Sequence, residues 1–127
     1  MTIESSNELI VRFPAKGGYL EISRLNATAM AATAGFDVTE LDDIRLAVNE
    51  AVAWLLDDEV TGTVELAIVA SPGELGFRGA VSGPQIPELQ VHDLLHAIMG
   101  ATTDSYEAGL DDGGNRFLSF AKRAANG

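Results

Sequence analysis

Apolar residues in the first third of the chain recur at helical intervals. Between Tyr19 and Ala34 this spacing predicts a helix, and Gly35 follows it as a left-handed stop. The residues expected on its buried face are Ile22, Leu25, Ala29 and Ala32. The chain therefore has a first amphipathic helix soon after its N-terminus.

A second apolar stripe follows the i, i+3, i+4 spacing more closely. Thr39 is the expected helix cap, with Asp42 three residues later. The stripe consists of Leu41, Ile44, Val48, Ala51, Val52 and Leu55. Asp57-Asp58-Glu59 follows, and we expect fraying there because negative charges are unfavourable at a helix C-terminus.

Five segments have the alternating or β-branched pattern of strands. Pro72-Gly73 predicts a type II turn between the second and third, and Asp111-Asp112-Gly113-Gly114 predicts a hairpin turn between the last two. A third helix is expected over Leu89–Met99, after the breaker-rich loop Ser82–Pro87. The strand segments are Leu9–Phe13, Thr63–Ala70, Leu75–Val81, Asp104–Leu110 and Asn115–Ala121.

The element order is thus β α α β β α β β. Tight turns join most of the strands, and the helices are too few to cover both faces of a sheet. The pattern predicts a single α+β domain over residues 1–127, built as a two-layer sandwich with the helices on one face of the sheet.

The net charge of the protein limits the classes of molecule that it is expected to bind. The 127 residues include 19 Asp and Glu but only 8 Lys and Arg, which gives a net charge of −11. Such an excess repels phosphate backbones and anionic lipids, so neither a nucleic acid nor a membrane surface is expected as a partner. A protein with a basic face is favoured instead.

Other features indicate a cytoplasmic protein. The chain has no cysteine, which excludes disulfides and thiolate metal sites. Its longest uncharged run, Leu25–Phe36, has 12 residues and is too short to cross a bilayer. The N-terminus lacks the basic and apolar regions of a signal peptide.

Residues 13–52, FPAKGGYLEISRLNATAMAATAGFDVTELDDIRLAVNEAV, resemble the N-terminal half of the anti-sigma-factor serine kinases. This family belongs to the GHKL superfamily of histidine-kinase-like ATPases. The strand-ending F-P-A, Arg24, the G-F before a capped helix and the D-I-R-L-A-V-x-E-A run occur in the family's order and spacing. The resemblance implies the Bergerat fold, with a mixed but mostly antiparallel sheet.

The family's first nucleotide motif is altered in this sequence. It places a Glu and an Asn four residues apart on the second helix, and the corresponding residues here are Glu50 and Trp54. An indole has no oxygen with which to hold Mg²⁺, so Trp54 cannot replace the metal-binding amide. Trp54 is also bulky, and we expect it to fill part of the former cavity. By resemblance, Glu50 would be the general base of an active enzyme, and it is otherwise a polar residue at the edge of the core.

The second and third nucleotide motifs are altered as well. Asp-x-Gly-x-Gly aligns with Val81-Ser82-Gly83-Pro84-Gln85, in which only Gly83 survives. Valine cannot accept the hydrogen bond of the adenine amino group, which leaves a donor unmatched at a cost of about 1–3 kcal/mol. The glycine-rich lid would fall near Leu89–Leu95, which contains no glycine. We therefore expect ATP binding to be lost.

The resemblance implies a regulatory protein that sequesters a partner, a sigma factor or an anti-anti-sigma protein of the STAS type. Arg24 matches the helix-one arginine with which the family grips these partners. The alternative for Arg24 is a surface residue paired with Glu21. The alternative function is an active serine/threonine kinase that uses ATP and Mg²⁺ to phosphorylate the STAS protein. A homodimer through strand edges or the first helix is a further possibility.

No metal site is expected. His92 and His96 stand four apart on the third predicted helix, but they are the only histidines and VHDLLH is not the H-E-x-x-H motif. Asp111-Asp112 lacks the spaced oxygen ligands of a calcium loop, so a hairpin turn is the better interpretation.

Overall fold

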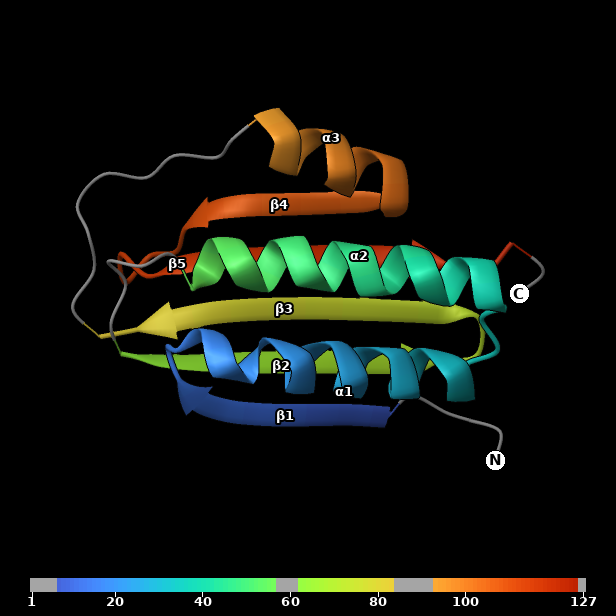
Figure 1. The fold of residues 1–127 in the computed structure, drawn as a ribbon, viewed down its shortest axis with the longest axis horizontal. Coiled ribbons are helices and arrows are strands. Elements are labelled where there is room, and N and C mark those ends of the chain that lie inside the picture. Colours follow the sequence, from blue (N-terminus) through green and yellow to red (C-terminus); the bar gives the residue numbers. More distant parts are fainter. Residues whose placement is uncertain (1–6, 57–61, 84–92, 126–127) are drawn as a thin grey trace.

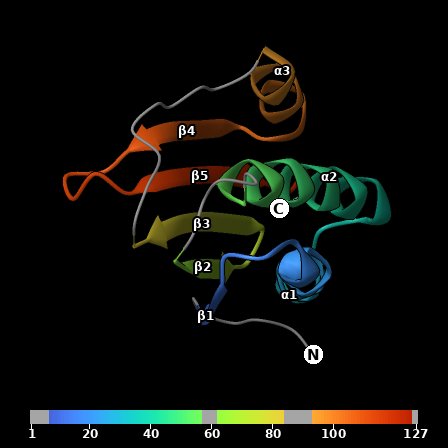
Figure 2. The same ribbon diagram turned by 60° about the vertical axis from the view of Figure 1, so that its left-hand side comes forward.

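The computed structural model describes residues 7–56, 62–83 and 93–125. Five strands form one sheet in the order β1-β2-β3-β5-β4. Helices α1 (Leu20–Thr33), α2 (Val38–Leu55) and α3 (Asp93–Thr102) lie on one side of it, as Figure 1 and Figure 2 show, and a 3₁₀ turn (Gly17–Tyr19) precedes α1. The strands are β1 (Asn7–Pro14), β2 (Thr63–Ser71), β3 (Glu74–Ser82), β4 (Ser105–Leu110) and β5 (Arg116–Arg123). The predicted α+β class, element order and placement of helices on one face are confirmed.

The sheet differs from the expected mixed type, because every pairing between the described strands is antiparallel. Two of the connections are tight turns, β2 to β3 and β4 to β5, which impose antiparallel pairing. Between β1 and β2 the chain runs along α1 and back along α2, so β2 starts at the end where β1 stops (Figure 1). The chain reverses direction on entering α1, again on entering α2 and again on entering β2 (Figure 1). Strand β2 is therefore antiparallel to β1.

The buried face of α1 is not the predicted one. Ile22 and Leu25 are 44% and 57% exposed, and Ala29 and Ala32 are also exposed. The helix instead buries small residues, Ser23, Ala27 and Ala31. Both sets of residues have helical spacing, and the small set lets α1 lie close to α2 and the sheet, which larger side chains would prevent.

Helix α2 buries the predicted stripe, but it begins earlier than predicted. Asp37, not Thr39, is the N-cap. Its carboxylate accepts a hydrogen bond from the Glu40 backbone N–H at 2.8 Å, while the Glu40 carboxylate accepts one from the Asp37 backbone N–H at 2.9 Å. This capping box satisfies two backbone donors at the start of the helix, whereas a cap at Thr39 would leave Val38 outside it.

Removing the cap should lower stability measurably. For Asp37→Ala we expect a loss of about 1 kcal/mol in the free energy of unfolding, because the Glu40 N–H loses its acceptor. Urea denaturation followed by circular dichroism measures it. Asp42→Ala is the matched control, since it removes only an exposed ion pair to Arg45 and should change stability by less than about 0.5 kcal/mol. Equal effects of the two variants would contradict the assigned cap.

The two predicted hairpins are confirmed. Gly73 has φ +74°, as the third position of a type II turn requires, and it follows Pro72 between β2 and β3. In the β4–β5 turn, the Asp111 carboxylate accepts hydrogen bonds from the backbone N–H groups of Gly113 and Asn115, both at 2.9 Å. Asp111 thus serves as a turn residue.

Some predictions fall outside the described residues. These are the fraying at Asp57-Asp58-Glu59, the loop from Pro84 to Pro87 and the start of the third helix before Asp93. Within the described part, α3 continues to Thr102, three residues beyond the predicted end. None of the helices described combines the length and the apolar character needed to cross a bilayer.

Candidate functional site

Trp54 lies in the last turn of α2 and is only 8% exposed. The guanidinium carbon of Arg116, the first residue of β5, lies 5.0 Å from the centre of its indole ring. The same arginine donates a hydrogen bond from Nη1 to the backbone carbonyl of Trp54 at 3.0 Å. One side chain of β5 therefore contacts both the ring and the backbone of Trp54.

Arg116 is itself 5% exposed, which is unusual for a charged residue. Its position at the carboxyl end of α2 explains why it is tolerated there, because that end of a helix carries partial negative charge and unsatisfied carbonyls. The cation–π contact adds to this attraction. Arg116 and Trp54 thus join the start of β5 to the last turn of α2.

The sequence analysis missed Arg116, although the sequence contains a signal for it. Strand residues alternate between faces, so Arg116 shares the inward face with Leu118 and Phe120, both of which are buried. A basic residue in an inward position of a predicted strand is a candidate for a specific internal contact.

Glu50, one turn before Trp54, is partly exposed. The Nδ2 atom of the neighbouring Asn49 donates to its carboxylate across 3.4 Å, a long hydrogen bond. No other side chain is recorded within hydrogen-bonding reach of Glu50 among the described residues. This geometry suits a polar residue at the edge of the core.

The second altered motif lies at the end of β3. Val81 is fully buried and pairs with Val64 of β2, and Gly83 follows with φ +121°. A valine side chain offers no acceptor for an adenine amino group at this position. Pro84, Gln85 and most of the expected lid segment lie outside the described residues.

Helix α2 approaches the sheet closely at Gly79, two residues before Val81. A Cβ atom added to Gly79 of β3 would lie 2.6 Å from Leu55 Cδ1 and 3.0 Å from Leu66 Cδ2. Helix α2 and strand β3 are therefore in close contact at Gly79, with no room for a side chain there.

Arg24 occupies a different place, in the groove between α1 and α2. It forms the ion pair with Glu21 that the alternative interpretation predicts, and it also donates from Nη1 to the side-chain oxygen of Asn49 on α2. An open hollow of about 430 Å³ surrounds it. The lining residues are Glu21, Arg24, Asp42, Arg45, Leu46 and Asn49.

The side chains that line this hollow are mostly polar, and their charges balance. Arg24 and Arg45 offset Glu21 and Asp42 in a protein whose net charge is −11. Ile22, Leu25 and Leu46 are each more than two-fifths exposed on the same two helices. Arginine is enriched in protein–protein interfaces, and the buried core of an interface is more apolar than the rest of the surface. We call Ile22, Arg24, Leu25 and Leu46 the α1–α2 surface.

His96 is the histidine that lies in the described part of the chain. His96 makes a 2.7 Å hydrogen bond between Nδ1 and the Tyr106 hydroxyl, which joins α3 to β4. His92 lies outside the described residues. Over residues 7–56, 62–83 and 93–125, no three His, Cys, Asp or Glu side chains are placed to hold a metal ion together.

Comparison with known proteins gives no further assignment. No family model matches the sequence. No curated protein is significantly similar to it.

Proposed function

We propose that this protein is a degenerate relative of the anti-sigma-factor serine kinases, with a Bergerat-type fold, that binds a protein partner without using ATP. The observation that carries the proposal is the burial of Trp54 beneath Arg116. In the family that it resembles, this position holds the asparagine that anchors Mg²⁺. Here an arginine, itself positively charged, occupies the vicinity and would repel a metal cation.

Opening this site to a nucleotide would be costly. Arg116 would have to leave the indole ring and the Trp54 carbonyl, which leaves a buried acceptor without its donor at a cost of about 1–3 kcal/mol. Val81 would in addition leave the adenine amino group unmatched. The first penalty arises between α2 and β5, and the second arises on β3. One substitution therefore cannot remove both.

The α1–α2 surface supports partner binding. The exposed residues of α1, at positions 22, 25, 29 and 32, are spaced three, four and three apart. This is the spacing of a helix that packs along another helix, and alanines at the last two positions allow close approach. We infer that the partner presents an amphipathic helix, as a sigma factor can, and that a STAS-type protein competes for the same surface.

Arg24 should be central to this contact. For Arg24→Ala we expect the dissociation constant for the partner to rise about 10- to 100-fold, because an arginine that is a hot spot of an interface contributes about 1.4–2.7 kcal/mol to binding. Calorimetry with purified sigma factors and STAS proteins from the same genome measures the effect. Lys16→Ala removes the same charge from an exposed position outside the surface, and it should leave affinity unchanged.

Two results would contradict the proposal. One is failure of the wild-type protein to bind any of these partners. The other is transfer of phosphate from Mg·ATP to a STAS protein, which would favour the active kinase instead. Arg24→Ala with unchanged affinity would place the contact on another surface.

A further inference from the structure

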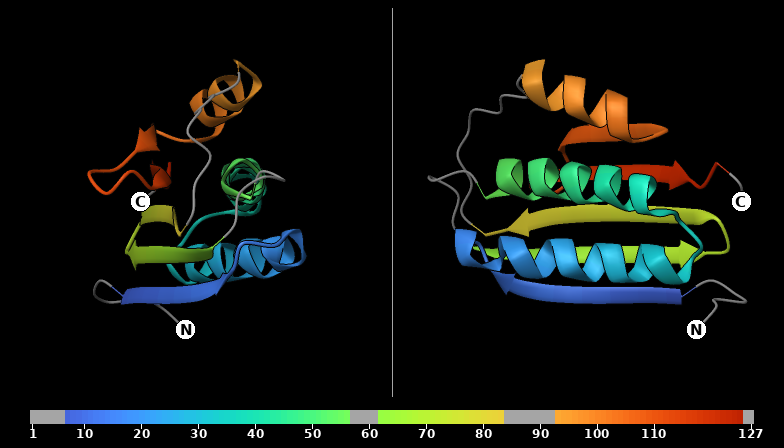
Figure 3. Two further views of the ribbon diagram at one scale, coloured as in Figure 1. Left: turned by 90° about the vertical axis from the view of Figure 1, so that its left-hand side faces the viewer. Right: turned by 45° about the vertical axis from the view of Figure 1, so that its right-hand side comes forward.

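Asn49 of α2 lies beside Arg24 of α1 at the α1–α2 surface. The two helices run side by side along the same face of the sheet (Figure 3). Asn49 is partly exposed and lines the hollow that surrounds Arg24. Its side-chain oxygen, Oδ1, accepts the hydrogen bond that Arg24 donates from Nη1. A residue of one helix therefore holds the end of a long side chain of the other.

The side-chain amide of Asn49 is oriented by two neighbours of opposite charge. Oδ1 faces the Arg24 guanidinium, and Nδ2 donates a long hydrogen bond, 3.4 Å, to the carboxylate of Glu50. If the amide were turned over, its N–H groups would face the cation and its oxygen would face the anion, and both contacts would be repulsive. Asparagine satisfies both neighbours because an amide carries an acceptor and a donor, whereas leucine offers neither and aspartate offers only the acceptor.

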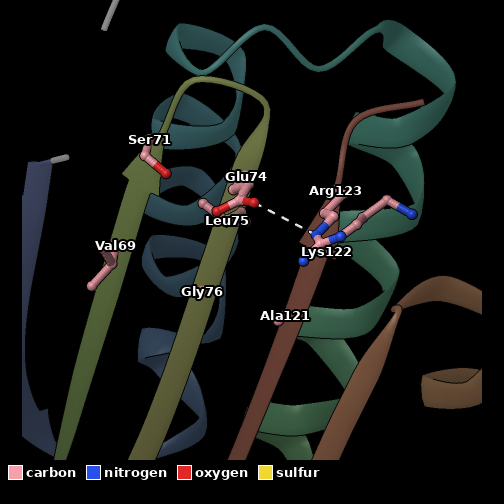
Figure 4. Close-up of a pocket in the computed structure, with 8 residues that line it drawn as sticks. All are labelled: Val69, Ser71, Glu74, Leu75, Gly76, Ala121, Lys122 and Arg123. Carbon is pink, nitrogen blue, oxygen red and sulfur yellow. Dashed lines mark ion pairs between the residues drawn. The ribbon is translucent and has the colours of Figure 1, made fainter. Parts of the chain in front are cut away.

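Arg24 is held more completely than an arginine that pairs at the open surface. Its side chain is 27% exposed, and it donates from Nη2 to Glu21 of its own helix and from Nη1 to Asn49 of α2. At the end of β5, by contrast, the side chain of Arg123 is 79% exposed and meets Glu74 of the neighbouring strand at 3.5 Å (Figure 4). Two bonds from different helices fix the plane of the Arg24 guanidinium, whereas an exposed ion pair restrains its arginine much less.

The restraint of Arg24 in the free protein has a consequence for binding. A long side chain loses conformational freedom when a partner immobilises it, and this loss lowers the affinity. Where the free protein already holds the side chain in its bound orientation, most of that loss has occurred during folding and does not weaken the complex. An effect of Asn49 on affinity should therefore act through Arg24.

We propose that Asn49 is a positioning residue of the α1–α2 surface. It holds the Arg24 guanidinium in the orientation in which a partner binds, and it does so before the partner arrives. This role rests on the proposed partner binding. It adds a residue that the resemblance leaves open, because position 49 is the x of D-I-R-L-A-V-x-E-A. The hydrogen bond between Asn49 and Arg24 belongs to the free protein, so it can also be tested without a partner.

The first test is NMR of the arginine side-chain nitrogens in the free protein. Hydrogen bonds from both Nη atoms slow rotation about the Nε–Cζ bond, so we expect separate Nη signals for Arg24, identified by their absence from Arg24→Ala. In Asn49→Leu, which is similar in size and makes no hydrogen bond, these signals should average. Asn49→Asp keeps the acceptor oxygen and should preserve them, and circular dichroism establishes that each variant is folded. Averaged signals in the wild type, or separate ones in Asn49→Leu, would overturn the proposal.

The second test is a double-mutant cycle, measured by calorimetry with the same purified sigma factors and STAS proteins. Asn49→Leu should raise the dissociation constant about 3- to 10-fold in the otherwise wild-type protein, because Arg24 must then be ordered on binding. In the Arg24→Ala background the same substitution should have no further effect. Asn7→Leu makes an identical change at an exposed position of β1 and should leave the affinity unchanged.

The outcomes separate this role of Asn49 from the function on which it rests. A wild type that binds none of these proteins overturns both. If the wild type binds and Arg24→Ala weakens the complex, an unchanged affinity for Asn49→Leu overturns the positioning role alone. An equal loss of affinity in both backgrounds also overturns it, since Asn49 would then contact the partner itself.

Discussion

Gly62→Ala is expected to destabilise the protein by about 3–5 kcal/mol, a large part of the total stability of a domain of this size. Gly62 has φ +115°, and a Cβ atom there would lie 2.0 Å from the backbone carbonyl oxygen of Ser82. A side chain is therefore strained by the backbone conformation and also collides with main chain that cannot rotate away. Urea denaturation measures the loss.

Gly35→Ala separates the two causes. Gly35 has a similar positive φ, +98°, but no atom lies within 4 Å of the Cβ position. Only the conformational strain remains, and we expect a loss of about 1 kcal/mol. A loss at Gly62 no larger than the loss at Gly35 would mean that the start of β2 and the end of β3 do not approach as closely as described.

Arg116→Ala is expected to lower the free energy of unfolding by about 2–4 kcal/mol. The substitution removes the hydrogen bond to the Trp54 carbonyl and leaves a void beside the indole ring. Trp54 is the only tryptophan, so its fluorescence reports directly on the site. We expect emission at longer wavelength in the folded variant, because water reaches the ring.

Arg45→Ala is the matched control for this arginine. Arg45 is exposed and pairs only at the surface with Asp42, so its loss should change stability by no more than about 0.5 kcal/mol and should not alter the fluorescence. If Arg116→Ala behaved like Arg45→Ala, the arginine would not be holding the indole in place.

The fold could be predicted from the sequence because its strands and turns carry local signals. Alternation in β2, with Val64, Leu66 and Ile68 inward, and the Pro72-Gly73 turn both specify the observed hairpin. The orientation of α1 could not be predicted in this way. Two faces of α1 carry apolar residues at helical spacing. Which face is buried depends on how closely α1 packs against α2 and the sheet. A hydrophobicity pattern does not contain that information.

The candidate site was predictable in part. The apolar stripe of the second helix predicts that Trp54 lies on α2, and the structure places it there, buried. That it stands in place of a metal ligand is what the resemblance implies. Its contact with Arg116 depends on pairing between residues 62 positions apart, so only the folded chain reveals it. The contact of Arg24 with Asn49 on α2 also joins residues that are far apart in the sequence, so it too becomes visible only in the folded chain.

The most direct test of the central claim is titration calorimetry of the wild-type protein with Mg·ATP, with Trp54 fluorescence recorded in parallel. We expect no heat of binding and no change in emission up to millimolar nucleotide, because Arg116 and Trp54 close the site and Val81 offers adenine no acceptor. Binding tighter than about 100 μM, near −5.5 kcal/mol, accompanied by a change in the tryptophan signal, would contradict the claim.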